Sequence, residues 1–215
     1  MSLKVNEIFY SIQGESTFAG RPCVFVRLTG CNLRCSYCDT RYAYEEGNEL
    51  EIDEILRRVK SYTCPLVEVT GGEPLIQKET PFLLRRLLDE GYQVLLETNG
   101  SQDISRVDKR CIKIIDIKCP SSGESDKNDL RNLEKLNKDD ELKFVIADRE
   151  DFEYAKGILA GMNQKHSKTD VTHLSPAFGK MDPAIMAKWI LKDHLDVRLQ
   201  LQLHKFIWDP GQRGV

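Results

Sequence analysis

Short apolar runs alternate with amphipathic segments along most of the chain. The runs are five or six residues long, rich in Val, Ile, Leu and Phe, and several contain almost no polar residue. Such runs are typical of strands that are buried on both faces of a parallel sheet. We therefore predict strands at 23–28, 66–70, 93–97, 112–117, 142–146, 171–175 and 198–203.

The segments between these runs have the apolar spacing of helices. Apolar residues recur at three- and four-residue intervals over 52–59. A second helix is expected over 80–91, with proline in its first turn and glycine at its end. Two more helices are expected over 150–162 and 182–194.

The order of strands and helices predicts the fold class. Strands that alternate with helices form α/β folds with a parallel sheet and right-handed crossovers. About six such units fit into 215 residues, fewer than the ~250 residues typical of a complete eight-unit barrel. We therefore expect a single domain over 1–215, with a partial (β/α)6 TIM-like barrel of parallel strands. The polar stretch 121–140 is interpreted as a surface insertion with a short helix near 130–136.

Composition narrows the partners that the chain is expected to have. The hydrophobic content is 40%, the charged content is 30%, and the formal net charge is -3. Binding along a nucleic-acid backbone needs clustered Lys and Arg, which a balanced charge does not favour. The apolar runs are too short for a membrane span, and the N-terminus lacks the apolar core of a signal peptide. We therefore expect a cytoplasmic protein that binds neither nucleic acid nor membrane, with His166 in a solvated polar loop.

Three of the seven cysteines lie close together in the sequence. Cys31, Cys35 and Cys38 have the spacing C-x3-C-x2-C and follow directly on a predicted strand. The odd number of cysteines and the absence of an export signal argue against a disulfide framework. Thiolates on one short loop favour an iron–sulfur cluster or zinc, and three ligands leave one iron of a four-iron cluster open to a cofactor.

Two other readings of this cysteine group remain open on spacing alone. A zinc site usually has a fourth ligand, and no second cysteine pair is present, while His173 and His204 are remote in the sequence. Three buried core cysteines are the other alternative, which the polar residues between them disfavour.

The cysteine spacing, with Tyr37 before the last cysteine, resembles the radical S-adenosylmethionine (SAM) superfamily. The sequence GGEP at 71–74, after the next predicted strand, is similar to a second motif of that superfamily. The resemblance implies a [4Fe–4S] cluster on Cys31, Cys35 and Cys38, with SAM at the open iron. It also implies reductive cleavage of SAM to a 5′-deoxyadenosyl radical, with the glycines letting the backbone approach the cofactor.

The two ends of the chain make the resemblance more specific. The sequence FYSIQGE at 9–15 and the sequence HKF at 204–206 resemble the 7-carboxy-7-deazaguanine synthase family of queuosine biosynthesis. That family implies a carbon–nitrogen lyase that converts 6-carboxy-5,6,7,8-tetrahydropterin to 7-carboxy-7-deazaguanine with loss of ammonia. Hydrogen abstraction by the radical and a ring contraction assisted by Mg²⁺ would carry the reaction.

The resemblance also implies the site residues. Arg27 suits the substrate carboxylate because a guanidinium forms bidentate pairs, and Thr40 offers an oxygen ligand to Mg²⁺. The expected pterin contacts are Ile12, Gln13, Gly14, Arg27, Thr70 and Pro210. The expected cofactor contacts are Tyr37, Cys38, Asp39, Gly72, Glu73, Glu97, Lys118, Cys119, Pro120, Ser175, Pro176, Ala177 and Phe178. Residues 211–215 continue beyond Pro210, which leaves open what role the end of the chain has.

Two alternative functions remain open at this level. A glycyl-radical enzyme activase has the same cysteine spacing but acts on a protein backbone, and the blocks at 9–15 and 204–206 count against it. A non-catalytic zinc-binding interaction module would leave the GGEP loop unexplained. As partners the family implies an electron donor, a flavodoxin or ferredoxin, and a second copy of the chain in a homodimer.

Overall fold

A single nine-stranded sheet runs through the described part of the chain, in the order β3-β1-β2-β4-β5-β6-β7-β8-β9. The computed structural model describes all residues except 165–168 and 170, so His166 lies outside the described residues. Neighbouring strands from β2 to β9 pair in parallel, whereas β1 pairs antiparallel with both β2 and β3. The strands are β1 (Ser2–Ile12), β2 (Pro22–Leu28), β3 (Asn48–Glu51), β4 (Leu66–Gly71), β5 (Gln93–Thr98), β6 (Ile112–Ile117), β7 (Glu141–Ile146), β8 (Val171–Pro176) and β9 (Arg198–Leu199).

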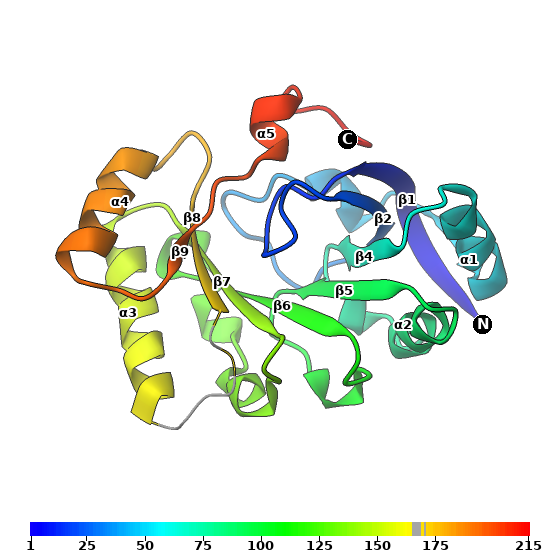
Figure 1. Cartoon of the computed structure of the whole chain (residues 1–215), viewed down its shortest axis with the longest axis horizontal. Coiled ribbons are helices and arrows are strands. Elements are labelled where there is room, and N and C mark those ends of the chain that lie inside the picture. The colour runs from blue at the N-terminus through cyan, green and yellow to red at the C-terminus, as the bar shows by residue number, and fades with distance from the viewer. Residues whose placement is uncertain (165–168, 170) are drawn as a thin grey trace.

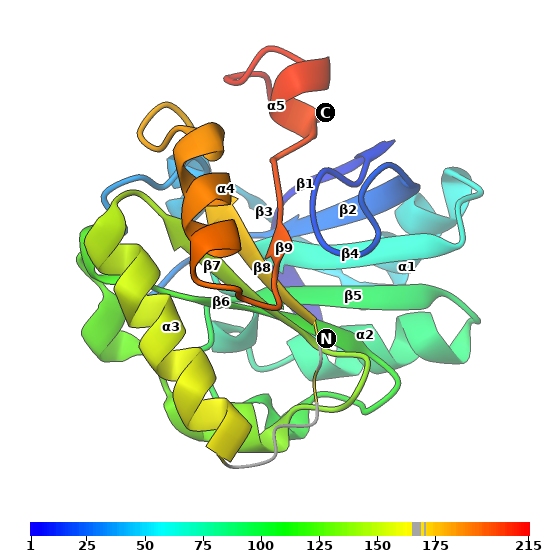
Figure 2. The ribbon, with the colours of Figure 1, turned by 60° about the vertical axis from the view of Figure 1, so that its left-hand side comes forward.

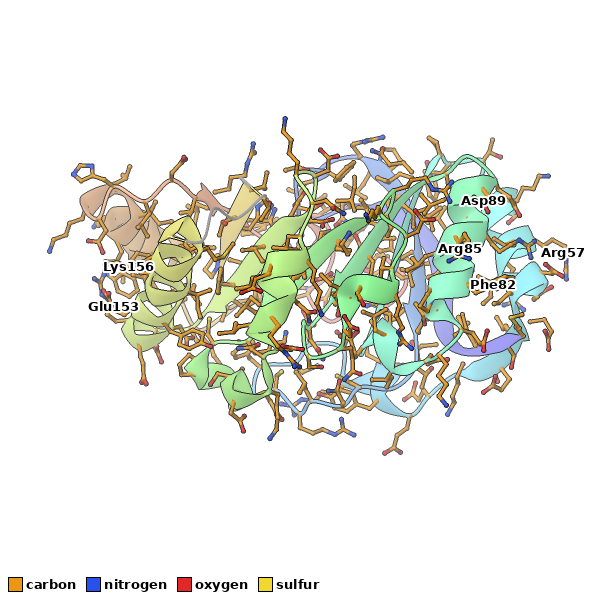
Figure 3. The ribbon with its side chains drawn as sticks, turned by 90° about the horizontal axis from the view of Figure 1, so that it is seen from below. Arg57, Phe82, Arg85, Asp89, Glu153 and Lys156 are labelled. Atoms are coloured by element: carbon orange, nitrogen blue, oxygen red, sulfur yellow. The ribbon has the colours of Figure 1, made fainter. Side chains whose placement is uncertain are left out.

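Helices cover the outer side of this sheet. They are α1 (Ile52–Ser61), α2 (Thr80–Asp89), α3 (Arg149–Gln164) and α4 (Pro183–Lys192), while the short α5 (His204–Ile207) lies outside this layer (Figure 1). α1 and α2 lie at one end of the molecule and α3 and α4 at the other, while α5 lies apart from them beside the C-terminus (Figure 1, Figure 2). In Figure 3, Arg85 on α2 and Lys156 on α3 mark these opposite ends. The central strands are buried on both faces, as their apolar sequences predict.

The sheet is open, because its order runs from β3 to β9 without the two edges pairing. The expected partial barrel of parallel strands is therefore confirmed. α1 to α4 provide four of the crossovers between parallel strands. The β5–β6 and β6–β7 connections contain only 3₁₀ turns among their described residues, so the strict strand–helix repeat is interrupted there.

The polar stretch 121–140 is more closely packed than its composition indicates. It forms 3₁₀ turns, including Leu130–Lys135 where a short helix was expected. Asn132 is buried, and its amide nitrogen donates to the carbonyl oxygens of Gly100 and Gln102. The stretch therefore packs against the loop after β5 rather than extending into solvent.

Two strand expectations differ from the structure. The expected strand at 198–203 is shortened to Arg198–Leu199, because the backbone then turns toward the start of the chain and Leu203 N donates to Gly14 O. β1 and β3 were not expected, because their polar residues hide the alternation of a half-exposed antiparallel strand. No helix among the described residues has the length and apolar character needed to cross a membrane.

Candidate active site

The loop that follows β2 carries Cys31, Cys35 and Cys38 at the carboxyl edge of the parallel sheet. All three residues line one cavity of about 680 Å³. Two hydrogen bonds hold this loop to the stretch 121–140. Ser36 N donates to Ser122 O over 3.0 Å, and Arg34 N donates to Glu124 Oε1 over 2.7 Å. The stretch 121–140 therefore supports the loop that holds the cysteines.

The loop after β4 lies against this cysteine loop. A Cβ atom on Gly72 would collide with the carbonyl oxygen of Gly30 and lie 2.7 Å from the Cβ atom of Cys31. Gly71 has a φ of 146°, which other residues rarely adopt, and it packs on the backbone of Leu28. The two glycines of the GGEP sequence thus allow two loops to meet beside Cys31.

Glu73 holds these loops together from behind. Its buried carboxylate accepts hydrogen bonds from Leu75 N at 2.9 Å, Asn99 N at 2.7 Å and the hydroxyl of Thr98 at 2.9 Å. Burial raises the pKa of Glu73, and the backbone hydrogen bonds from Leu75 and Asn99 oppose this rise. Glu73 does not line the cavity, so in this structure its side chain braces the GGEP loop against the end of β5.

The cysteine loop has the donors and the space that an iron–sulfur cluster needs. Three thiols line one cavity, and the close contact of Gly72 with Gly30 and Cys31 holds the GGEP loop beside them. Two polar atoms of the same wall, the Tyr37 hydroxyl and Asp116 Oδ1, are buried without a hydrogen-bond partner in the described structure. Among the described residues no three His, Cys, Asp or Glu side chains are arranged around a single metal ion. A four-iron cluster is larger than one ion and holds its thiolates apart, so this finding concerns mononuclear sites.

The start of the chain and β2 form a further part of the cavity lining. The amide nitrogen of Gln13 donates to the Glu68 carboxylate, and both residues are buried. Arg27, at the end of β2, lines the cavity and donates through Nε to Glu7 Oε1 over 2.7 Å. Amide and guanidinium groups therefore line the same cavity as the three cysteines.

A buried group of charges forms the floor of the cavity. The Lys143 ammonium bonds the Glu15 carboxylate and lies 2.7 Å from Glu97 Oε1. Burial disfavours both charges, yet the pair outweighs it, so the pKa of Lys143 is well above and that of Glu15 below the usual value. Burial, with repulsion from Glu97 and Glu15, raises the pKa of Glu68 well above its usual value.

The segment around α5 closes the cavity from the far end of the chain. Leu203 N donates to Gly14 O over 2.9 Å, and Lys205 Nζ lies 2.6 Å from Asp39 Oδ2. His204 lines the cavity and packs so closely on Gly14 that an added Cβ there would lie 2.9 Å from its ring carbon Cγ. Burial lowers the pKa of His204, so its imidazole is neutral near pH 7.

Most residues expected from the sequence line this one cavity. They are Ile12, Gln13, Gly14, Arg27, Cys31, Cys35, Tyr37, Cys38, Asp39, Thr40, Thr70, Gly72, Glu97, Lys118, Ala177, Phe178 and Pro210. The cavity lining does not include Glu73, Cys119, Pro120, Ser175 or Pro176. Cys119 is buried, and its thiol points to the carbonyl oxygen of Ile117.

The sequence reasoning missed several charged and aromatic residues of the cavity. Glu68 and Lys143 sit inside strands that are otherwise apolar, and a charge in a buried strand is itself a signal of a functional site. Three further lining residues, Glu15, His204 and Lys205, lie in the FYSIQGE and HKF blocks, which supported the resemblance without giving these residues a role. The lining residues that carry no signal in the sequence are Tyr42, Tyr44, Lys180, Gln202 and residues 211–215.

An open parallel sheet with a three-cysteine loop at its carboxyl edge and a glycine pair beside it is the architecture of a radical SAM enzyme. Residues 25–118 match the family model described as the Radical SAM superfamily. The crystal structure of QueE from Escherichia coli is similar in fold, with a TM-score of 0.80, 24% identity and coverage of 95% of each chain. A structure of Streptococcus suis SuiB bound to the precursor peptide SuiA is also similar, with a TM-score of 0.59 and 15% identity over 80% of this chain and 46% of that one.

Similarity in sequence identifies the family. The 7-carboxy-7-deazaguanine synthase of Chlorobaculum tepidum is 50% identical, covering 99% of this chain and 97% of the relative. The enzyme of the same name from Koribacter versatilis is 44% identical, over 99% and 100% of the two chains. The chain belongs to the 7-carboxy-7-deazaguanine synthase family. As a member it is a lyase that uses a [4Fe–4S] cluster and SAM, and Mg²⁺ is typical of the family.

Proposed function

We propose that this chain converts 6-carboxy-5,6,7,8-tetrahydropterin to 7-carboxy-7-deazaguanine with loss of ammonia, as a step toward queuosine. The observation that carries this proposal is the shared cavity. One space is lined both by the three cysteines and by the Gln13–Arg27 wall, so a cofactor on the cluster and a substrate on that wall would meet within it. The relatives that carry the synthase name match almost the whole chain, which supports the same substrate.

Cys31, Cys35 and Cys38 would hold the [4Fe–4S] cluster. When bound, the cluster and SAM supply a carbon radical that abstracts hydrogen from the substrate. Burial raises the pKa of Cys35 to about 11, so the thiolate needs the positive charge of the metal and of the nearby Lys118. The cavity-lining residues expected for the cofactor are Tyr37, Asp39, Gly72, Glu97, Lys118, Ala177 and Phe178. Glu73, Cys119, Pro120, Ser175 and Pro176 would support this wall from behind.

On the substrate wall, Arg27 would bind the pterin carboxylate, and Gln13 would accept from and donate to the pterin ring. Ile12, Gly14, Thr70 and Pro210 would complete the contacts. Thr40 would be the Mg²⁺ ligand, since its hydroxyl donates to Asp39 Oδ1 over 2.9 Å and keeps its lone pairs for the cation. The Lys143–Glu15 ion pair and the neutral His204 would fix the positions of protons beside the bound substrate.

The same proposal includes two partners. A flavodoxin or ferredoxin would supply the electron, and a second copy of the chain would complete a homodimer. The dimer is checked by analytical ultracentrifugation of the cluster-loaded protein, where a single species of the monomer mass would contradict it.

An anaerobic assay tests the function. The protein is reconstituted with iron and sulfide and mixed with SAM, a reductant, Mg²⁺ and 6-carboxy-5,6,7,8-tetrahydropterin, and the products are separated by chromatography. Deazapurine formed in excess over SAM consumed supports the synthase. Release of 5′-deoxyadenosine without deazapurine would keep radical chemistry and remove the substrate assignment, as an activase would require. Absence of both iron and SAM cleavage would contradict the cluster itself.

A further inference from the structure

The geometry around Arg27 begins with an irregularity in β1. β1 and β2 pair antiparallel, and the register shifts between Val5 and Glu7, so that Glu7 lies directly opposite Arg27. A bulge of this kind re-aims a side chain, and directly opposite residues of an antiparallel pair share a face of the sheet. The bulge therefore places the Glu7 carboxylate directly opposite Arg27, near the end of β2.

Glu7 is bonded to two cavity residues but does not itself line the cavity. Its Oε1 accepts from Arg27 Nε over 2.7 Å and from the hydroxyl of Tyr42 over 3.0 Å. The Arg27 and Glu7 side chains are only 17% and 19% exposed, so solvent screens this contact weakly. Glu7 thus reaches the cavity only through Arg27 and Tyr42.

Aromatic rings fix the Arg27 guanidinium on its other sides. Its central carbon lies 5.6 Å from the ring centre of Phe9 and 5.9 Å from that of Tyr42. A guanidinium has five N–H donors in a rigid plane, and Nε is occupied by Glu7. In the described structure neither terminal nitrogen of Arg27 has a hydrogen bond or ion pair with a protein group. The edge formed by these two nitrogens is the one left for a bidentate carboxylate.

We propose that Glu7, held by Tyr42, is a positioning residue that orients Arg27 so that the end of its guanidinium receives the substrate carboxylate. This inference rests on the proposed function, since it assumes that Arg27 meets that carboxylate. Glu7 acts on binding rather than on the radical step. Its loss raises the dissociation constant for the carboxylated pterin and leaves turnover of bound substrate and cleavage of SAM unchanged.

Equilibrium binding tests this role in every variant, whether or not the variant turns over. The reconstituted protein with SAM and Mg²⁺, without reductant, is titrated with 6-carboxy-5,6,7,8-tetrahydropterin by calorimetry. Glu7→Ala is expected to weaken binding roughly ten- to hundredfold, as loss of a hydrogen bond to a charged group does. Glu7→Gln keeps the acceptor and is expected to stay within about threefold of the wild type. Tyr42→Phe, which removes only the second bond to Glu7, is expected to fall between them.

A double-mutant cycle separates positioning from a merely structural effect. In the Arg27→Ala background the Glu7→Ala change is expected to have no further effect on binding, because Glu7 acts through Arg27. Glu49→Ala, which removes an exposed carboxylate from β3 of the same sheet, is the matched control and keeps wild-type binding. Iron content and thermal unfolding are measured for each variant, to recognise one that does not fold.

Three outcomes would overturn the inference. In the first, Glu7→Ala binds the pterin as tightly as the wild type. In the second, Glu7→Ala weakens pterin binding even in the Arg27→Ala background. In the third, Glu7→Gln binds the pterin as weakly as Glu7→Ala, which would make the charge of Glu7 rather than the orientation of Arg27 decisive. Failure of the proposed function is distinguishable from these. In that case the wild type itself forms no deazapurine, whatever Glu7 does.

Discussion

At the scale of single residues, the seven cysteines differ only in where the fold places them. Cys31, Cys35 and Cys38 line the cavity, whereas Cys111 is buried and unbonded to any other cysteine. We expect Cys35→Ala to lose the brown colour, most of the iron and all SAM cleavage after anaerobic reconstitution. Cys111→Ala is the control and is expected to keep its iron. Equal iron in both variants would contradict the assigned ligands.

The raised pKa of Glu68 predicts how stability depends on pH. Burial first, and repulsion from Glu97 and Glu15 second, make the folded protein bind a proton more tightly at Glu68 than the unfolded chain does. Its contribution is therefore complete below the unfolded pKa of about 4.5 and is lost as pH rises toward the folded pKa. We expect Glu68→Gln, which mimics the protonated form, to gain stability relative to the wild type as pH rises from about 5 to 8.

Chemical denaturation at a series of pH values measures this difference. Glu49→Gln, an exposed carboxylate, is the control, and its free energy of unfolding is expected to follow the wild type at every pH. A Glu68→Gln offset that stays constant with pH would show that Glu68 does not take up a proton on folding.

Residue-level prediction from the sequence was limited by distance along the chain. Tyr37, Cys38 and Thr40 were found because they lie next to one another in a recognisable motif. Lys143 was not assigned, because no recognised motif contains it and only the folded sheet brings it to the same cavity as Gln13. His204 lies in the HKF block, which supported the resemblance without giving this residue a role. A motif contains residues that are close in sequence, whereas the charged residues at the floor of the cavity are far apart in sequence and close only in the folded protein.

At the scale of elements, Gly72 controls whether two loops can meet. Alanine there would place Cβ against Gly30 O and 2.7 Å from the Cβ atom of Cys31. We expect Gly72→Ala to displace the cysteine loop and to reduce iron content severalfold, since a backbone clash of this kind is not relieved by side-chain motion. Gly157→Ala, in α3 with no atom within 4 Å of the new Cβ, is the matched control. It is expected to keep its iron and to gain up to about 1 kcal/mol of stability.

The α5 segment is joined to the cysteine loop by one ion pair. The Lys205 side chain is 8% exposed and its Nζ lies 2.6 Å from Asp39 Oδ2, beside the expected Mg²⁺ ligand Thr40. We expect Lys205→Met to raise the KM for the pterin roughly threefold to tenfold, with iron content unchanged. Lys192→Met at the end of α4 is the control. A loss of iron in Lys205→Met would instead place its role at the cluster.

The sequence predicted the buried elements better than the half-exposed ones. The bounds of β4 to β8 and of α1 to α4 were predicted to within a few residues. Their sequences show either a continuous apolar run, typical of a buried strand, or the three- and four-residue apolar spacing of a helix. β1 was missed although it carries Glu7 and ends in the Gln13 loop, because its exposed residues and its bulge break the alternation. The strand that carries Glu7 was therefore not recognised from the sequence.

At the scale of the whole molecule, a loop joins the two halves of the open sheet. The loop between β1 and β2 reaches β7, where Thr17 N donates to Glu141 Oε2 over 3.1 Å, and Glu141 also lies 2.7 Å from His173 Nε2. We expect Glu141→Ala to lower the free energy of unfolding by about 2–4 kcal/mol, since it leaves the buried His173 Nε2 without its partner and removes the bond to Thr17. Glu141→Gln is expected to cost less. If Glu141→Ala lowers the free energy of unfolding no more than Glu49→Ala does, the contact between this loop and β7 contributes little to stability.

The α5 segment also has a consequence for the order in which the protein becomes functional. Translation produces the cysteine loop and β4 long before it produces Gln202, His204 and Lys205, which contact Glu15, Gly14 and Asp39. Domains begin to fold while their later residues are still on the ribosome. The nascent chain can therefore present its three thiols for cluster assembly while the pterin side of the cavity is still open. This arrangement therefore predicts that metal loading precedes the docking of α5, which completes the cavity.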